Sequence, residues 1–170
     1  MLKEAKNNWI FVSVACAILF QGTVVPAFFR SSYVPNLAFS MCMIVALTRG
    51  KKSGIIAAAI CGLFQDIFMG QFIGMNVGVF ALFASIVGYF EPVLFKENTI
   101  TPFFIVTVTS IFQNLLNLLI VYILGPKIVV GFGILFEIFI AAIINAFIAS
   151  FVYWLGYVRK NSRHSNSMYL

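Results

Sequence analysis

The chain has 170 residues, of which 62% are hydrophobic and only 9% are charged. Soluble domains carry about 25% charged residues, so this composition excludes an ordinary soluble protein and predicts an all-α integral membrane protein. The formal net charge of +6 is then explained by loop lysines and arginines that fix the orientation in the membrane, and we expect no nucleic-acid partner.

Six apolar segments follow one another, most of them near the ~20 residues that cross a bilayer. We predict six transmembrane helices, at about 9–29, 36–48, 53–69, 72–89, 101–124 and 130–157, in a single polytopic domain (residues 1–158) followed by a basic cytoplasmic tail (residues 159–170). The second segment is short for a perpendicular span. We expect it to be tilted, to sit in a thinned bilayer, or to be partly re-entrant behind neighbouring helices.

Lysines and arginines predict the orientation. With six spans and an inside N-terminus, nine of the 11 basic residues fall on the inner side and two on the outer side. Cytoplasmic loops are enriched in basic residues, so the N-terminus and the C-terminus are both expected inside.

The third and fourth segments are joined by a very short connection, which predicts a tight antiparallel hairpin. Asp66 comes about five residues before this turn and Asn76 about five after it, so helix rise places the two at similar depth, close enough to hydrogen-bond. Helix rise puts further polar side chains in the same outer half of the membrane, forming an expected outer-half polar cluster: Gln21, Asn114, Asn117 and Glu137.

The two carboxyl groups within the predicted spans, Asp66 and Glu137, need a physical reason because an ionised group in hydrocarbon is costly. No lysine or arginine lies inside a span. Each carboxyl group is therefore expected to be protonated, or to reach water or a partner from the outer side. For the three amide residues of the cluster, bridging between helices is the ordinary role.

Catalytic and metal-binding patterns are missing from the sequence. The single histidine, His164, lies in the tail, and the three cysteines lie in three different apolar segments without a C-x-x-C pair. We therefore expect no enzyme activity, no metal and no cofactor.

Glycines surround Asp66 at a regular spacing. Gly62 and Gly70 each lie four residues from it, and Gly74 and Gly78 continue the repeat. Small residues at this spacing allow helix backbones to approach closely, which predicts a packing or partner-binding surface. Pro35 and Asn36 open the second segment and are assigned to the same candidate surface.

These residues resemble the rod shape-determining protein MreD family over roughly residues 33–90. The similarity rests on the Pro35-Asn36-Leu37 entry, the basic stretch from Thr48 to Lys52, Gly54, and the stretch from Gly62 to Gly74. Gly62, Leu63 and Asp66 match the family pattern G-L-x-x-D. Asn76 stands where many members have a histidine.

The resemblance implies a non-enzymatic subunit of the cell-elongation complex in the bacterial inner (plasma) membrane, scaffolding peptidoglycan synthesis. The implied partners are an MreC-like bitopic protein, a RodA-type glycosyltransferase with its class B penicillin-binding protein, indirectly MreB, and membrane lipid. The family is also similar in span arrangement to the S components of energy-coupling-factor transporters. The alternative function is therefore an S-component-like binder of a small vitamin-type substrate.

Overall fold

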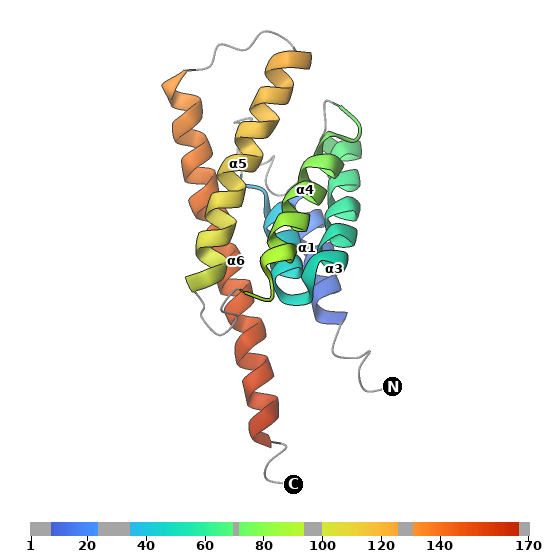
Figure 1. Cartoon of the computed structure of the whole chain (residues 1–170), viewed down its shortest axis with the longest axis vertical. Coiled ribbons are helices and arrows are strands. Elements are labelled where there is room, and N and C mark those ends of the chain that lie inside the picture. Colours follow the sequence, from blue (N-terminus) through green and yellow to red (C-terminus); the bar gives the residue numbers. More distant parts are fainter. Residues whose placement is uncertain (1–7, 24–34, 70–71, 94–99, 126–130, 167–170) are drawn as a thin grey trace.

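The computed structural model describes residues 8–23, 35–69, 72–93, 100–125 and 131–166, and these residues form helices joined by turns. The helices are α1 (Asn8–Thr23), α3 (Leu37–Met69), α4 (Met75–Phe90), α5 (Ile100–Leu124) and α6 (Phe132–Asn166). The prediction of an all-helical fold is confirmed. Figure 1 shows α5 and α6 together on one side of the molecule, and α1, α3 and α4 on the other.

Helix α3 is folded back on itself at Gly50, whose backbone (φ 80°, ψ −177°) departs from helical geometry. If α3 were straight, Asn36 and Gln65 would lie about 44 Å apart, because a helix rises 1.5 Å per residue. Instead, their side chains are joined by a hydrogen bond of 3.0 Å. Only glycine adopts this positive φ readily, so Gly50 divides α3 into an antiparallel first arm (residues 37–49) and second arm (residues 51–69).

The first arm is the central helix of the protein. Every residue from Pro35 to Leu47 is buried, and at about 20 Å the arm is too short to cross a hydrocarbon core of ~30 Å. Neighbouring helices surround it, which agrees with one of the alternatives open from the sequence. A short apolar helix can be placed in this way because other helices separate its ends from lipid.

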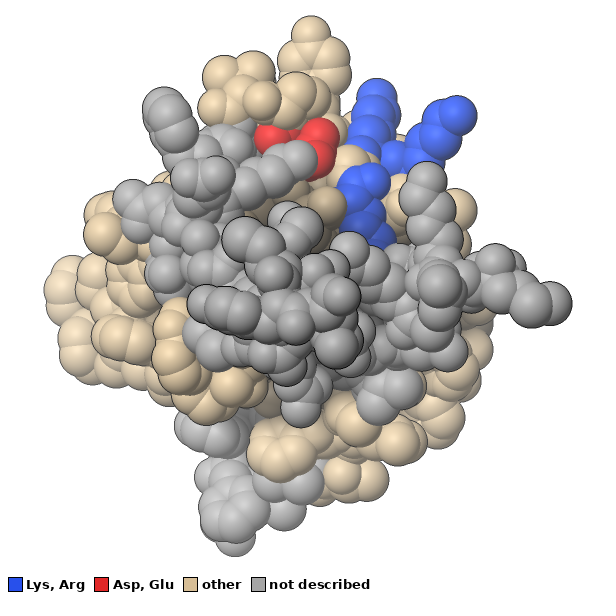
Figure 2. All heavy atoms as spheres, turned by 90° about the horizontal axis from the view of Figure 1, so that it is seen from below, with Lys and Arg blue, Asp and Glu red and all other residues tan. Residues whose placement is uncertain are grey.

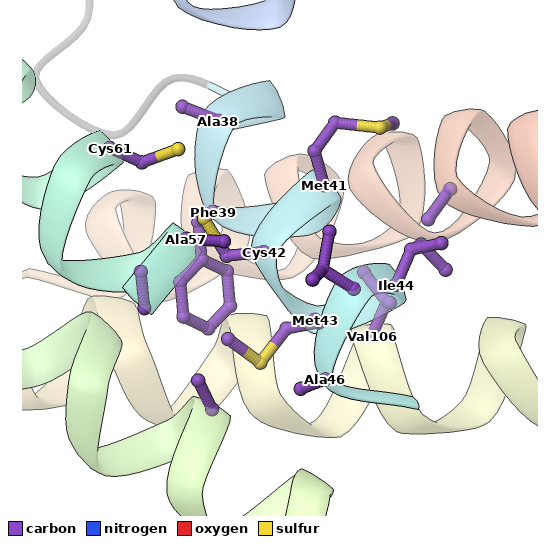
Figure 3. Packing of buried hydrophobic residues seen from close by; sticks show 14 of the residues in the cluster. Ala38, Phe39, Met41, Cys42, Met43, Ile44, Ala46, Ala57, Cys61 and Val106 are labelled. Atoms are coloured by element: carbon purple, nitrogen blue, oxygen red, sulfur yellow. The ribbon is translucent and has the colours of Figure 1, made fainter. Parts of the chain in front are cut away.

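Aromatic and sulfur-containing side chains of the first arm form the centre of the core (Figure 3). The ring of Phe39 meets the rings of Phe80 and Phe83 on α4 edge to face, with centroids 5.0 and 6.0 Å apart. Cys42 and Cys61, from the two arms of α3, are fully buried free thiols in the same cluster. This core therefore joins both arms of α3 to α4.

The outward faces of the helices are apolar, as a lipid environment requires. On the second arm of α3 the exposed side chains recur every three or four residues: Ile56, Ile60, Leu63, Phe64, Ile67 and Phe68. Helix α5 and residues Phe132–Leu155 of α6 are long and apolar enough to cross a membrane, and α4 is a shorter apolar helix.

Helix α6 continues beyond the end that we expected for it. The sequence predicts that the last span ends near residue 157 and that a tail follows, whereas the helix runs on to Asn166. In Figure 1 its C-terminal end extends past the other helices. The first part of the expected tail is therefore a helical extension of α6.

Charged side chains gather at the end of the molecule that contains the fold in α3. Arg49, Lys51 and Lys52 flank Gly50, and Glu91 Oε2 lies 3.8 Å from the position that a Cβ would occupy on Gly50. Figure 2 shows this end, with the basic side chains beside a carboxylate.

Candidate functional site

The N-terminus of α4 lacks a capping side chain of its own. Its N-cap residue is Gly74, in the left-handed conformation with φ 94°. A helix N-terminus leaves four backbone N–H groups without intrahelical partners, and these normally bond to a side-chain oxygen of the cap residue or to water. Inside a membrane water is scarce, so α4 needs an acceptor from elsewhere.

Asp66 supplies that acceptor from the end of α3. Its Oδ2 accepts hydrogen bonds from the backbone N–H groups of Gly74 (2.8 Å) and Val77 (3.3 Å). Its Oδ1 accepts from the backbone N–H (3.0 Å) and the side-chain Nδ2 (2.9 Å) of Asn76. The remaining N–H, that of Met75, donates to the carbonyl of Phe72. All four N-terminal donors of α4 are therefore satisfied, three of them by one carboxyl group that is 2% exposed.

This geometry gives Asp66 a partner that the sequence did not suggest. We expected a protonated carboxyl group or one open to water or a partner, since no lysine or arginine was available. In the structure, both oxygens accept hydrogen bonds from the start of α4, where the helix dipole is positive, and from the Asn76 amide. The Asp66–Asn76 hydrogen bond itself is as the spacing predicts.

A second helix N-terminus, that of α3, is capped in a related way. Asn36 Oδ1 accepts from the backbone N–H of Phe39 (3.0 Å), and Gln21 Oε1 of α1 accepts from that of Leu37 (2.9 Å). Asn36 Nδ2 donates to Gln65, the neighbour of Asp66. Pro35, also buried, directly precedes this cap. Asn36 thus closes the helix start and ties the two arms of α3 together.

One layer of hydrogen bonds joins these groups across the fold. Asn117 on α5 donates through Nδ2 to Asn76 Oδ1 at 3.4 Å, which extends the network to a fourth helix. We call this set the Asp66 layer: Gln21, Asn36, Gln65, Asp66, Asn76 and Asn117. It links α1, both arms of α3, α4 and α5 at one depth. The sequence placed five of the six at this depth or at the entry of the second segment. It gave no role to Gln65, although its position next to Asp66 in the sequence could have indicated one.

Glu137 lies outside this layer. Its side chain is exposed on α6, whereas the next residue, Ile138, is buried. Consecutive helical residues point about 100° apart, so the face that buries Ile138 turns Glu137 outward. Asn114, also expected in the cluster, is buried but contributes no hydrogen bond to the layer. Gly70 lies outside the described residues.

The glycines near Asp66 differ in their roles. A Cβ on Gly62 would lie 2.6 Å from the backbone of Val77, so Gly62 sets the close approach of α3 and α4. Gly74 is required by its positive φ at the start of α4. A Cβ on Gly78 would meet nothing within 4 Å. Only Gly78 therefore has no role inside the described fold.

A second polar region lies between α5 and α6, which we call the α5–α6 seam. Ser110, Gln113, Asn114 and Asn117 share one face of α5, and Asn145 and Ser150 belong to α6. Asn145 Nδ2 donates to Ser110 Oγ at 3.3 Å. Five other buried atoms have no hydrogen-bond partner among the described residues: Gln113 Oε1, Asn114 Nδ2, Asn117 Oδ1, Asn145 Oδ1 and Ser150 Oγ.

Unpaired polar atoms in such a position are unfavourable. Each buried donor or acceptor without a partner costs roughly 1–3 kcal/mol, and hydrocarbon offers no substitute. Sequence reasoning recognised Asn114 and Asn117 but gave Gln113 and Ser110 no role. Their spacing with Asn114 and Asn117, three and four residues apart, was the signal that could have revealed a polar face.

The fold and its buried polar layer define an all-helical membrane protein in which one carboxyl group, that of Asp66, holds a helical hairpin together. The family model described as rod shape-determining protein MreD matches residues 4–159 of the chain. The chain therefore belongs to the MreD family, a family of rod shape-determining membrane proteins, and the similarity noted over residues 33–90 extends along almost its whole length. Neither the comparison with curated proteins nor that with solved structures found a match.

Proposed function

We propose that this protein is a non-enzymatic scaffold of the bacterial cell-elongation complex, in the inner membrane. The observation that carries the proposal is the use of Asp66. All the acceptor positions of this carboxyl group bind the start of α4 or Asn76. It thereby serves to hold a hairpin rigid, which is what a surface for partner helices needs.

We infer that the membrane domain consists of six helical segments: α1, the two arms of α3, α4, α5 and α6. The first arm of α3 lies enclosed by the others and does not span the hydrocarbon core by itself. The fold at Gly50 supports this count, because it makes two antiparallel segments of α3. We infer that the end with Arg49, Lys51 and Lys52 is cytoplasmic, since basic residues favour that side. On the basis of these six segments and this orientation, we propose that the fold is similar to that of the S components of energy-coupling-factor transporters.

The partner surface that we propose is the outward face of α4 around Gly78. Gly78 is exposed, and so are Leu82 and Ile86, which lie four and eight residues further along on the same face of α4. A glycine with open space above it lets the backbone of another helix approach closely. The proposed partners are an MreC-like bitopic protein and a RodA-type glycosyltransferase with its class B penicillin-binding protein, with MreB reached indirectly.

A pull-down with a matched pair of variants tests this surface. Gly78→Leu fills the proposed contact, whereas Gly22→Leu fills an equally open position on α1. Each variant is purified from detergent-solubilised membranes of its host and its partners are identified by mass spectrometry. We expect Gly78→Leu to lose the bitopic partner and to leave depleted cells round, whereas Gly22→Leu retains both the partner and rod shape.

Two outcomes would contradict the proposal. Equal recovery of the bitopic protein by both variants would move the contact away from α4. Co-purification of an ATPase module with a coupling membrane subunit as the main partners would instead favour the S-component-like function.

A further inference from the structure

The α5–α6 seam has a polar lining that the fold itself does not use. Gln113 is 1% exposed and Asn145 is 0% exposed, yet the carbonyl oxygen of each side chain has no partner among the described residues. The same holds for Asn114 Nδ2, one residue along from Gln113. Buried polar atoms in proteins are nearly always paired, so these atoms are available to bind a group that is not part of the described fold.

The unpaired atoms specify the chemistry of that group. Three are amide carbonyl oxygens, one is an amide nitrogen and one is a hydroxyl oxygen, so the molecules that pair with them must between them donate several hydrogen bonds and accept at least one. Helix α5 carries no charged residue, and neither does α6 from Ile138 to Leu155. Without a countercharge, a charged group would be strongly disfavoured there.

We propose that the α5–α6 seam is an intramembrane binding site that admits small uncharged hydrogen-bonding molecules, water being the smallest of them. Asn117 places the site in contact with the Asp66 layer, because its Nδ2 bonds to Asn76 while its Oδ1 is left for the seam. The site stands independently of the partner surface on α4, so either can fail without the other.

Cysteine labelling in the full chain tests the site directly. The natural thiols are first removed (Cys16→Ser, Cys42→Ala, Cys61→Ala), and Asn114→Cys is compared with Ala84→Cys, a fully buried apolar position on α4, outside the seam. The probe is 2-hydroxyethyl methanethiosulfonate, which is uncharged. A cysteine thiolate attacks its sulfenyl sulfur, forming a mixed disulfide and releasing methanesulfinate, and the thiolate forms readily only where water reaches.

We expect Asn114→Cys to react at least tenfold faster than Ala84→Cys in membrane vesicles. Adding Gln113→Met, which makes the seam apolar without changing its volume much, should slow the labelling at position 114 about tenfold. The same Gln113→Met change in the natural chain should leave the melting temperature unchanged or raise it, since no bond recorded for the fold is lost. Ser110→Cys serves as a second reporter if Asn114→Cys does not fold.

Each other result would overturn the proposal. Equal labelling at positions 114 and 84, or labelling at neither, would mean that the seam gives no selective access to polar molecules. If labelling at position 114 persists after Gln113→Met, the access of the probe does not depend on the amide side chain of Gln113. A melting temperature lowered by Gln113→Met as much as by Asn76→Leu would mean that Gln113 is paired within the fold.

Discussion

The Asp66 layer and the α5–α6 seam are both buried and both made of polar side chains, but they satisfy hydrogen bonding very differently. In the layer, Asp66 alone accepts four hydrogen bonds. In the seam, Asn145 bonds to Ser110 at 3.3 Å, but five buried atoms lack hydrogen-bond partners among the described residues. The layer is therefore organised for stability, whereas we propose that the seam binds molecules that enter it.

Backbone geometry explains the difference. The layer is built around helix starts, where N–H groups that have no intrahelical partner supply a surplus of donors. The seam runs along the middles of α5 and α6, where every backbone group is already paired within its helix. No free backbone N–H groups remain there, so side-chain oxygens such as Gln113 Oε1 can accept only from other side chains or from an incoming molecule.

The largest effect should come from removing the acceptor of the layer. Asp66→Ala leaves three N–H groups of α4 without partners, and we expect the melting temperature of the detergent-purified protein to fall by about 10 °C. Asp66→Asn keeps one oxygen and turns an amide N–H₂ toward backbone donors, so a fall of about 5 °C is expected. Thermal unfolding followed by circular dichroism measures both. A silent Asp66→Asn would indicate a protonated carboxyl group and would weaken the contrast between layer and seam.

A smaller effect should follow from forcing the hairpin apart. In Gly62→Ala the new Cβ would lie 2.6 Å from the Val77 backbone, so α3 and α4 must separate and the Asp66 bonds must lengthen. We expect the melting temperature to fall by about 5 °C. Gly78→Ala is the control, because its Cβ meets nothing, and it should melt like the natural protein. If Gly62→Ala and Gly78→Ala have the same melting temperature, the hairpin accommodates a Cβ at position 62 and is not packed tightly enough to hold the Asp66 bonds in place.

The smallest effect compares one bond in each region. Asn36→Ala removes the cap of α3 and the link to Gln65, and we expect a fall of about 3 °C. Ser110→Ala removes only the 3.3 Å bond of the seam and should change the melting temperature by about 1 °C or less. If Ser110→Ala is instead as destabilising as Asn36→Ala, the seam contributes to stability and the contrast between the regions fails.

The sequence by itself determined the class of the protein, its helical content and the proximity of Asp66 to Asn76. Composition excluded a soluble fold, and the short uncharged connection between the third and fourth segments fixed the depth of both residues relative to the turn. These properties follow from hydropathy and helix rise, which depend only on neighbouring residues.

Only the tertiary structure decided how the polar groups are used. The central position of the first arm, the exposure of Glu137 and the capping of α4 by Asp66 all depend on the rotation and packing of helices that are distant in sequence. The partner of Asp66 could not be read from side chains, because it is mainly the backbone of another helix. The same reason hid the seam, since an unpaired atom is recognised only when all its neighbours are in place.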